Sequence, residues 1–375
     1  MGGRALVAGA GIGGLAVARL LRDAGFEVEV LERSQHLAPL GAGITLWPNA
    51  TRVLRKLGLD DALLEPLPMS ELGLHRWDGR MLVATDLTAL ERRYDAPLLA
   101  LQRTTLHDAL LGDGIRDLVR TGAEVLSAEE TSSGVKAVTR NGECFEAEVL
   151  IGADGVHSAV RQSLLADGAP RSSGILAYRA VIDPLPLQVS PGEYWGAGCV
   201  FAIAPIEGRL FWLATRRMSA DEPAEPNPIP GLLERHRDWV PEIPIVIEAT
   251  KPEEVMQHEL FDRKPVKRWA GDRIALLGDA AHPMLPVLGP GACQALEDAQ
   301  ALAKTLSASG DVPSALREYQ EMRRRRAARL TIASRRIGQI AHLRAAPLRA
   351  VRDRAVAIVP ERIRDRQVDS IVGRS

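Results

Sequence analysis

The chain has 375 residues, which is enough for two domains or for one large domain with a substantial core. Basic and acidic residues nearly balance at a net charge of −1, so no overall field is expected to recruit nucleic acid or an anionic membrane. Cys144, Cys199 and Cys293 are odd in number and far apart, which predicts neither a disulfide framework nor a metal site and is typical of a reducing cytoplasm. No apolar run approaches the roughly 18 residues of a membrane span, and no signal-peptide pattern opens the sequence.

Residues 4–33 predict a strand, a glycine turn, a helix and a second strand. Ala5 to Ala8 is a short apolar run, and Gly9, Gly11 and Gly14 follow it as Gly-x-Gly-x-x-Gly where the helix must begin. The first glycine permits a tight turn, the second lets the backbone approach a pyrophosphate, and the third lets the helix pack closely on the strand. Phosphates are therefore expected at the positive end of the helix dipole.

An acidic residue closes this unit. Glu32 lies 18 residues after Gly14, at the end of the second strand. A carboxylate at that place accepts hydrogen bonds from a ribose diol and repels a 2′-phosphate. The alternative is a plain glycine turn with a solvated Glu32, but strand, helix, strand and acid are all in register for a nucleotide site.

The next segments leave the nucleotide unit. Gly41 to Ala50 mixes glycines with Trp47 and predicts a loop, which is either a plain connector or a wall beside a planar ring. A helix is expected from about Thr51 to Leu57. From Leu72 to Leu87, two alternating segments flank Asp78-Gly79, a favoured two-residue turn, and predict a β-hairpin.

Two further transitions into helices follow. Thr104 or Thr105 is expected to cap a helix, which places Arg103 where a guanidinium can meet a phosphate, although a plain surface arginine is the alternative. Glu124 to Ile151 predicts a β-meander that leads into GADGVHSAVR. Asp154 in that block lies at a strand-to-helix turn, where Ser158 or Asp154 is expected as a plain helix cap, or Asp154 as a group that contacts a ligand.

Residues from Ser172 to about Phe261 are rich in aromatic residues and prolines and predict a second domain built on a mostly antiparallel sheet. Glu207-Gly208 is expected to join its middle strands. Four of the six tryptophans fall in this region or in the earlier hairpin: Trp77, Trp195, Trp212 and Trp239. These aromatic residues either line a pocket for a planar molecule or form core.

The C-terminal third returns to the nucleotide unit. Arg273 to Gly278 predicts a buried strand, and Gly289, Pro290 and Gly291 form a second glycine turn before a helix from about Ala292 to Leu306. The N–H donors of that helix suit a partial negative charge on a ring system. The remainder, to about residue 352, is predicted to be helical with a basic, solvated face rather than a membrane anchor.

Three motifs together resemble the single-component flavoprotein monooxygenases, also called the aromatic-ring hydroxylase family. They are GAGIGG at Gly9, GADGVHSAVR at Gly152 and GDAAHPMLPVLGPGACQALEDA at Gly278, in the family's order and spacing. The resemblance implies an α/β fold in which a glutathione-reductase-like, Rossmann-type FAD domain with C-terminal helices is interrupted by a mostly antiparallel substrate sheet. The FAD domain is expected over residues 1–70, 97–170 and 265–375, and the substrate domain over 71–96 and 171–264.

The resemblance also implies where FAD binds. Glu32 holds the adenosine ribose, Arg103 approaches the phosphates, Asp154 belongs to a motif linked to FAD and NAD(P)H, and Asp279 meets the ribityl and pyrophosphate region. Pro286 and the turn to Cys293 face the flavin ring. The full expected set is Gly9, Gly11, Ile12, Gly13, Gly14, Glu32, Arg33, Gly43, Arg103, Asp154, Gly278, Asp279, Pro286, Gly289, Gly291, Ala292 and Cys293.

The implied reaction is hydroxylation of an aromatic or polycyclic small molecule with NAD(P)H and O2 through a flavin C4a-hydroperoxide. No second Gly-x-Gly-x-x-Gly provides a nicotinamide domain, so the reductant is expected to bind transiently. The alternatives are an FAD-dependent epoxidase, a urate-hydroxylase-like enzyme, or a non-catalytic flavin-binding sensor. Partners are expected to be the aromatic substrate and O2, with neither nucleic acid nor membrane, in a monomer or homodimer located in the cytoplasm.

Two departures from the family pattern bear on the substrate. Gly289-Pro290-Gly291 stands where many relatives have Gly-Gln-Gly, and Val200 and Phe211 align approximately with the polar Arg and Tyr of urate hydroxylases. Arg179 and Tyr178 are candidates to anchor a phenol or carboxylate, and Pro286 is a third candidate for the catalytic set, while core packing is the alternative for the sheet residues. The predicted substrate pocket consists of Trp47, Trp195, Phe201, Phe211 and Trp212.

Overall fold

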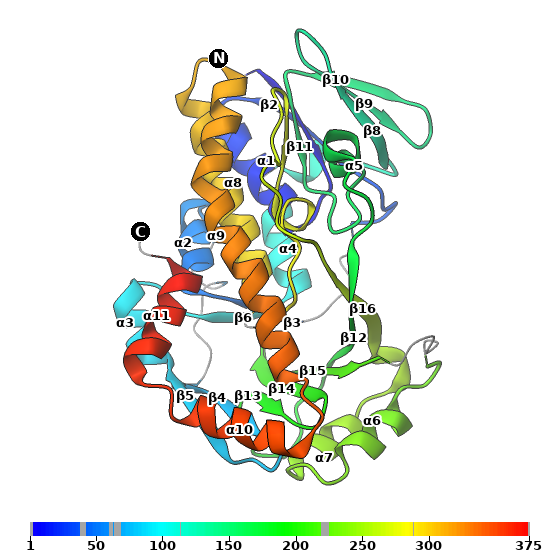
Figure 1. The fold of residues 1–375 in the computed structure, drawn as a ribbon. Helices are drawn as coiled ribbons and strands as arrows, with labels where there is room; N and C mark the ends of the chain where they lie inside the picture. Colours follow the sequence, from blue (N-terminus) through cyan, green and yellow to red (C-terminus); the bar gives the residue numbers. More distant parts are fainter. Residues whose placement is uncertain are drawn as a thin grey trace.

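A computed structural model describes residues 3–37, 43–59, 63, 69–112, 114–218, 225–287 and 289–373. Gly41 and Ala42 of the expected loop, and Pro223 of the proline-rich run, lie outside these ranges. The chain forms two large sheets, one at each end of the molecule, and long C-terminal helices run between them (Figure 1).

A parallel sheet contains the N-terminus and has the strand order β17-β11-β1-β2-β7. Its strands are β1 (Arg4–Ala8), β2 (Glu27–Glu32), β7 (Val119–Thr121), β11 (Val149–Gly152) and β17 (Ile274–Leu276). The apolar run of β1 is buried throughout, as expected for a central parallel strand. Helix α1 (Ile12–Asp23) begins directly after the glycine turn and packs against α4 (Arg103–Leu111) and α8 (Pro290–Ala308). The predicted strand, helix and strand are confirmed.

The predicted β-meander is also present. It consists of β8 (Val125–Glu130), β9 (Val135–Thr139) and β10 (Cys144–Ala147), which pair in antiparallel fashion. The chain then enters β11 of the parallel sheet and turns into α5 (Ala159–Leu165), which packs on β8. The motif at Gly152 therefore lies at the carboxyl end of a parallel strand, where ligands of such sheets bind.

The second sheet has the order β16-β12-β15-β14-β13-β4-β5. Its strands are β4 (Glu71–Arg76), β5 (Met81–Asp86), β12 (Arg171–Ile182), β13 (Gly192–Trp195), β14 (Cys199–Ile206), β15 (Arg209–Arg217) and β16 (Met256–Asp262). All neighbouring pairs are antiparallel except β13 and β4. The hairpins at Asp78-Gly79 and Glu207-Gly208 form as predicted. Glu207 and Gly208 have φ of 47° and 73°, which gives the tight turn that matches strand twist.

The two faces of this sheet have different neighbours. One face packs on α6 (Ile229–His236) and α7 (Glu242–Glu248), two short helices that the sequence reading did not predict. On the opposite face, Ile175 and Ala177 pack against Leu285, with Val287 beside them. The second face therefore meets the segment that precedes the Gly289 turn.

A two-stranded ribbon lies between the sheets. It pairs β3 (Gly43–Leu46) with β6 (Leu99–Gln102), so the prediction of a loop across 41–50 was wrong for these four residues. The local sequence could not show this strand because its partner comes more than fifty residues later. Helix α2 (Pro48–Lys56) starts earlier than expected, since the fixed φ of Pro48 suits the first helical position. Helix α3 (Leu87–Tyr94) follows the hairpin.

The predicted threonine cap was also wrong. Helix α4 (Arg103–Leu111) begins at Arg103 after Gln102, and no side chain caps it. The Thr105 hydroxyl instead donates to the Glu207 carboxylate at 2.9 Å, which draws it away from the helix backbone.

Four helices end the chain: α8 (Pro290–Ala308), α9 (Val312–Ala341), α10 (Ala346–Ala357) and α11 (Glu361–Val372). Figure 1 shows α9 extending from the parallel sheet to the antiparallel one. The Tyr319 hydroxyl near its start donates to the Leu276 carbonyl of β17 at 2.9 Å, and His342 at its end lies 2.9 Å from the Thr215 hydroxyl of β15. One helix thus contacts both sheets.

Candidate active site

The first glycine turn is shaped by close backbone approaches. Gly9 has φ of 101°, and a Cβ there would lie 2.5 Å from the Ala153 carbonyl oxygen. A Cβ on Gly14 would lie 1.9 Å from the Gly9 oxygen, whereas a Cβ on Gly11 would meet nothing within 4 Å. Gly9 and Gly14 are therefore required by packing, and Gly11 leaves open space in front of the α1 N-terminus, where a phosphate can approach.

The three sequence motifs converge at this turn. A Cβ on Gly9 would also lie 3.1 Å from Cα of Asp154 in the second motif. A Cβ on Gly13 would lie 2.6 Å from a Leu277 methyl group and 3.1 Å from Cβ of Ala295, so the third motif and α8 pack against the same turn. His107 of α4 lies 2.8 Å from the Ala10 carbonyl, which brings the helix that carries Arg103 to the same place.

Glu32 and Arg33 lie at the end of β2. One Glu32 oxygen accepts a hydrogen bond from the Ala10 N–H at 2.8 Å, and the other accepts from the Ser34 N–H at 2.8 Å. The carboxylate is thus tied to the glycine turn itself and remains partly accessible. Arg33 is exposed.

Asp154 caps α5. Its Oδ2 accepts from the Ala159 and Val160 N–H groups at 2.8 and 3.2 Å, and its Oδ1 is buried with no partner among the described residues. Burial raises the pKa of Asp154, while Ser158 and the backbone N–H groups act in the opposite direction. The two roles considered for Asp154, helix cap and ligand contact, are therefore compatible. Its Oδ2 accepts from the helix N–H groups, and its Oδ1 has no partner among the described residues.

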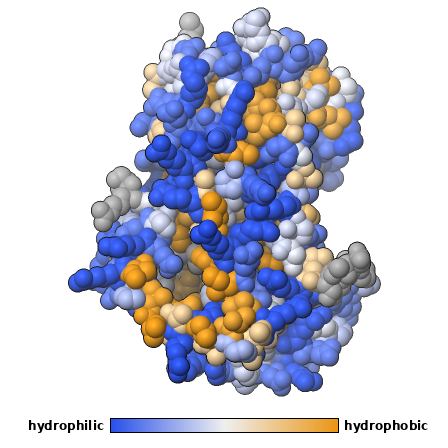
Figure 2. All heavy atoms as spheres, viewed as in Figure 1, coloured by the Kyte–Doolittle hydropathy of each residue, from blue (hydrophilic) through white to orange (hydrophobic). Residues whose placement is uncertain are grey.

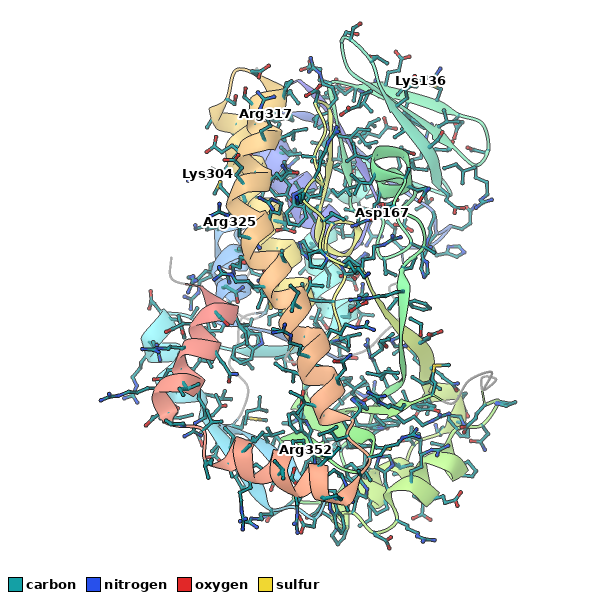
Figure 3. The ribbon with its side chains drawn as sticks, in the orientation of Figure 1. Lys136, Asp167, Lys304, Arg317, Arg325 and Arg352 are labelled. Atoms are coloured by element: carbon teal, nitrogen blue, oxygen red, sulfur yellow. The ribbon has the colours of Figure 1, made fainter. Side chains whose placement is uncertain are left out.

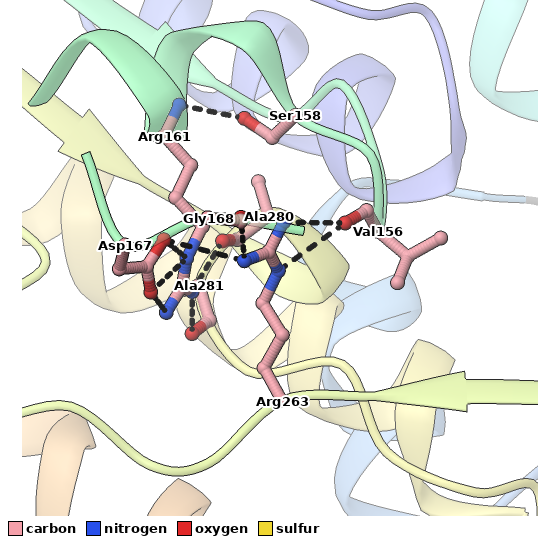
Figure 4. A network of polar contacts seen from close by, with 8 residues as sticks. All are labelled: Val156, Ser158, Arg161, Asp167, Gly168, Arg263, Ala280 and Ala281. Carbon is pink, nitrogen blue, oxygen red and sulfur yellow. Dashed lines mark hydrogen bonds and ion pairs between the residues drawn. The ribbon is translucent and has the colours of Figure 1, made fainter. Parts of the chain in front are cut away.

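A buried arginine connects the second motif to the third (Figure 4). Arg161 donates to the Ala280 and Ala281 carbonyls at 2.8 Å each and forms an ion pair with Asp167 at 2.5 Å. Arg263 also reaches Asp167, at 3.2 Å, and donates to the Gly168 carbonyl at 2.6 Å. These contacts fix the two motifs relative to each other.

The third motif is held from behind by a buried carboxylate. Asp298 of α8 accepts from the Gly278 N–H at 3.1 Å, lies 2.5 Å from Nε2 of His282, and accepts from Nε of Arg323 at 2.7 Å. Burial alone would raise its pKa, but His282 and Arg323 hold the pKa of Asp298 at about 2. The sequence analysis did not identify Asp298. The one feature of the sequence that indicates it is a carboxylate among the apolar residues of the predicted helix.

Asp279 follows in the 3₁₀ turn η4 (Gly278–Ala280), where Gly278 has φ of 59°. More than a third of the Asp279 surface is accessible. Desolvation by the surrounding protein raises its pKa, and the charges of His282 and Arg103 act to lower it. Arg103 is exposed and makes no hydrogen bond or ion pair within the described part of the chain.

The second glycine turn leads into α8. Gly289 has φ of 63°, no side chain caps the helix, and Gly291 and Ala292 are partly exposed. Cys293 is buried, its sulfur accepts from the Trp47 N–H at 3.3 Å, and burial raises the pKa of the thiol to about 12. The turn therefore presents backbone N–H donors beside a neutral thiol. Pro286 is partly exposed, and its carbonyl accepts from the Gly289 N–H at 3.0 Å.

The face of the antiparallel sheet that looks toward this turn carries an arginine. Arg179 alternates along β12 with Tyr178 and lies on the same face as Ala177. Its Nε is buried without a partner among the described residues. Desolvation and the nearby charge of Arg103 lower the pKa of Arg179 to about 10, so it stays cationic at neutral pH. His258 pairs opposite Ala177. Desolvation is the main cause, and the charge of Arg179 the second, that lowers the pKa of His258 to about 4.

The predicted pocket residues separate into two groups. Phe211 shares the Arg179 face, because it pairs with Val181, two residues after Arg179 on β12. A Cβ on Gly43 of β3 would lie 2.5 Å from the Phe211 ring. Tyr178, Phe201 and Trp212 point the other way, into the core against α6 and α7. They have 0 to 1 % exposure, and the Tyr178 hydroxyl accepts from Arg216 at 2.9 Å. Core packing was the stated alternative for these side chains.

Trp47 and Trp195, the other two tryptophans of the predicted pocket, are also buried. Trp47 precedes α2 and contacts Cys293 through its backbone. Trp195 lies in a small cluster with Val200 and Ala341, donates to Glu193 at 3.1 Å and has the Arg352 guanidinium 5.3 Å from its ring. Trp195 thus lies under α10.

A separate surface cavity of about 520 Å³ is lined by residues of α1, α2, α8 and α9. The α8 residues that line it include Gln300, Ala301 and Lys304, on the side of the helix away from Ala295, which faces the glycine turns. The cavity is therefore distinct from the site where the motifs meet.

Other site types are not found in the described ranges. No group of three or more His, Cys, Asp or Glu side chains there is arranged to hold a metal ion, and all three cysteines are free thiols. Within the same ranges, no helix is long and apolar enough to cross a membrane.

The residues present fit FAD. The space in front of Gly11 suits a pyrophosphate, Glu32 is placed for a ribose, and the exposed Arg103 offers a positive charge for phosphate groups. The uncapped α8 N-terminus offers backbone donors for a ring with partial negative charge.

Comparison with known proteins agrees with this fit. Residues 4–334 match the family model described as FAD binding domain. Relatives include an aurachin C monooxygenase/isomerase from Stigmatella aurantiaca, 37% identical over 89% of this chain and 88% of the relative. A 3-amino-4-hydroxybenzoate 2-monooxygenase from Streptomyces cremeus is 36% identical over 91% and 88% of the two chains. A 3-hydroxybenzoate 6-hydroxylase from Polaromonas naphthalenivorans is 32% identical over 96% and 93%.

A solved structure shows the same fold. HpxO of Klebsiella pneumoniae, complexed with FAD and uric acid, superposes with a TM-score of 0.90 at 27% sequence identity, over 98% of this chain and 96% of that chain. These relatives are enzymes, so the alternative of a non-catalytic flavin sensor is not retained. The protein is an FAD-dependent monooxygenase that uses NAD(P)H as reductant, and its chain belongs to the family of single-component FAD-dependent aromatic-ring hydroxylases.

Proposed function

We propose that the protein hydroxylates a planar aromatic acid, held between the flavin and the Arg179 face of the antiparallel sheet. The observation that carries this proposal is Arg179 itself. It is a mostly buried cation with an unsatisfied N–H, on the face that meets the Pro286 segment, and it shares that face with the Phe211 ring. An uncompensated buried cation is stabilised by an anionic partner, which supports a carboxylate or an ionised hydroxyl on the substrate.

The domain organisation supports a substrate site between two units. We assign residues 1–70, 97–170 and 265–375 to a glutathione-reductase-like FAD domain, and 71–96 with 171–264 to an inserted substrate domain. The strand membership of the two sheets supports this division, since β4, β5 and β12 to β16 form one sheet. Arg179 and Phe211 then line the substrate side, and Arg103 and Asp279 the FAD side.

We further propose cofactor contacts from this geometry. Glu32 binds the adenosine ribose, the turn from Gly9 to Gly14 binds the pyrophosphate, and Arg103 compensates phosphate charge. Asp279 accepts hydrogen bonds from the ribityl chain. The uncapped N–H groups at Gly291 and Ala292 meet the pyrimidine edge of the flavin, with Pro286 beside the ring.

When bound, FAD supplies hydride acceptance from NAD(P)H and activation of O2. The chain contributes positioning and electrostatics. The α8 N-terminus stabilises negative charge with backbone donors that need no reorientation. Asp298 keeps Gly278 and the adjacent Asp279 in place through a buried charge network. Phe211 excludes water from the substrate side, and Arg179 fixes the ring orientation.

His258 extends the substrate side. It stays neutral because desolvation and Arg179 lower its pKa to about 4, so one ring nitrogen can accept a hydrogen bond from a substrate hydroxyl. Such a hydrogen bond orients the substrate ring beside Arg179. Trp47 and Trp195 support the walls of the site from their buried positions.

NAD(P)H is proposed to bind transiently, and the protein to act as a monomer or homodimer in the cytoplasm. The three free thiols support a reducing compartment. O2 and an aromatic acid are the proposed small-molecule partners besides NAD(P)H.

The test is a screen of FAD-loaded protein against aromatic acids and their neutral carboxamides, monitored by NAD(P)H consumption, O2 uptake and product mass. We expect coupled turnover with at least one acid and a product that has gained one oxygen atom. Coupled turnover of the neutral analogues alone would contradict the acid assignment, and the absence of flavin reduction with every donor and compound would contradict hydroxylation.

A further inference from the structure

Helix α10 presents an apolar face to solvent. Eight of its residues are exposed, and Arg354 is the one charged residue among them: Ala346, Pro347, Leu348, Ala350, Val351, Arg354, Ala355 and Ala357. Leu348 is 55% and Val351 67% exposed, and Ile358, just after the helix, is 73% exposed. Surface helices of water-exposed domains normally place charged residues on this side.

The spacing of these side chains gives one continuous stripe. Leu348, Val351, Ala355 and Ile358 follow one another by three, four and three residues, which places them on one side of the helix. Figure 2 shows apolar residues gathered in this lower part of the molecule, where Figure 1 places α10. Met81 of β5, against which α10 packs, is 42% exposed and adds to the apolar surface.

The opposite side of α10 is anchored to the protein. Arg352 is buried, donates to the Ala341 carbonyl at 2.8 Å, pairs with Asp353 at 2.8 Å and stacks over Trp195. Figure 3 shows the position of Arg352 on α10. Val356 packs in the Trp195 cluster. The helix is therefore firmly oriented, and its outward stripe is a fixed feature of the fold.

The charges around the stripe are basic. Arg344, Arg354 and Arg362 are exposed, while the nearest acid on the helix, Asp353, is engaged by Arg352. Glu361, at the start of α11, is the one exposed acid in 344–362. An apolar face flanked by arginines is complementary to an anionic lipid surface, in which apolar side chains reach the acyl boundary and guanidinium groups meet phosphates.

A second copy of the chain is a poorer occupant. A 12-residue helix is about 18 Å long. Its exposed side is well below the roughly 800 Å² per partner that a stable dimer buries. A two-fold contact along the stripe would also bring each Arg354 toward its counterpart, which is repulsive. We therefore propose that α10 docks the protein on the surface of anionic membranes, with Leu348, Val351 and Ile358 inserted at the interface.

The first experiment is co-sedimentation of FAD-loaded protein with two kinds of vesicle. One is phosphatidylcholine alone, and the other is phosphatidylcholine with phosphatidylglycerol. We expect binding to the anionic vesicles at least about tenfold stronger than to the neutral ones, and weaker binding as salt is raised. The triple variant L348S/V351S/I358S should lose at least about tenfold of its partition coefficient, since each side chain contributes buried apolar area.

Matched variants distinguish membrane binding by the α10 stripe from binding by exposed apolar side chains in general. M322S/I332S/I245S removes three exposed apolar side chains elsewhere and should bind as the wild type does. R354Q/R362Q should reduce binding to anionic vesicles only. Flavin absorbance checks the folding of every variant. No sedimentation with either vesicle, or equal binding by wild type and L348S/V351S/I358S, would overturn the proposal. So would light scattering that shows a dimer which this triple variant dissociates.

Discussion

The Glu32 carboxylate shows how one side chain can serve both the fold and the ligand. It accepts from the Ala10 and Ser34 N–H groups, so it braces the first glycine turn, and it is still partly accessible. Because backbone donors already hold the Glu32 carboxylate in place, it loses little further conformational freedom when a ribose binds to it.

We expect Glu32→Ala to raise the dissociation constant of FAD about tenfold to a hundredfold. Hydrogen bonds to a charged group contribute about 1.5–3 kcal/mol. The measurement is a fluorescence titration of apoprotein with FAD. Glu29→Ala is the control, because Glu29 is on the same strand and pairs with Arg4. An unchanged constant for Glu32→Ala would remove the ribose assignment.

Arg179→Gln is expected to raise KM for an accepted aromatic acid by about a hundredfold. Truncating one partner of a buried charge pair costs about 2–5 kcal/mol. KM for the matching carboxamide should change little, since it has no charge for Arg179 to compensate. Steady-state kinetics on both compounds checks this. Arg217→Gln, an exposed arginine at the end of β15, is the control. An equal rise in KM for the acid and for the carboxamide would show that Arg179 stabilises the fold rather than binding the substrate charge.

Among the elements, β1, α1 and β2 were predictable because every signal is local: an apolar run, three glycines and a closing acid within 4–33. The two central hairpins were predictable for the same reason, from Asp78-Gly79 and Glu207-Gly208. Strand β3 and helices α6 and α7 were not. β3 depends on a distant partner strand, and α6 and α7 are short helices beside prolines whose apolar residues are buried by the sheet.

The site was predictable in part for a related reason. The motifs carry their own residue types, but the direction of a strand side chain depends on the pairing of the whole sheet. A one-residue difference separates Arg179, which faces the glycine turns, from Tyr178, which faces α7. The contacts of Asp298 with His282 and Arg323 form only when α8, the η4 region and α9 pack together. No local sequence pattern predicts them.

The pairing of α8 with the Gly278 turn depends on Asp298. Replacing it with Asn breaks a buried charge network, and we expect Asp298→Asn to lower the free energy of unfolding by about 3–5 kcal/mol. Denaturant titration of the FAD-loaded protein measures this. Asp311→Asn, which alters an exposed helix cap on α9, should lower it by no more than about 1–2 kcal/mol.

The pH dependence follows from the direction of the pKa shift. Because the pKa of Asp298 is held at about 2, below its ordinary value of 3.8, its ionisation contributes roughly 2 kcal/mol above pH 4. That contribution is lost as the pH falls from about 4 to about 2. The difference in unfolding free energy between wild type and Asp298→Asn should therefore shrink across this range. A constant difference would contradict the charge assignment.

At the scale of the whole molecule, Glu207 links the antiparallel sheet to β6 and α4. It lies in the β14–β15 turn and accepts from the Gln102 side chain at 2.7 Å, the Gln102 N–H at 3.2 Å and the Thr105 hydroxyl at 2.9 Å. The antiparallel sheet is thereby tied to the first turn of α4, which carries Arg103.

We expect Glu207→Ala to leave FAD affinity within about threefold of wild type while lowering the coupling of NAD(P)H oxidation to hydroxylation by at least about twofold. A small misplacement of substrate relative to flavin is costly for catalysis. Peroxide release per NAD(P)H consumed is the measurement. Asp183→Ala, an exposed acid on the same sheet that pairs with Arg209, should couple as the wild type does. Unchanged coupling in Glu207→Ala would show that this link has no catalytic role.

The length of α9 has a consequence for protein engineering. The helix is hydrogen-bonded to the parallel sheet at Tyr319 and reaches the antiparallel sheet at His342, so its 30 residues set the spacing between the two sheets. A chimera that exchanges the antiparallel sheet for that of a relative should also exchange the last turn of α9. Inserting a single residue in the helix would rotate that turn by about 100° and break the graft.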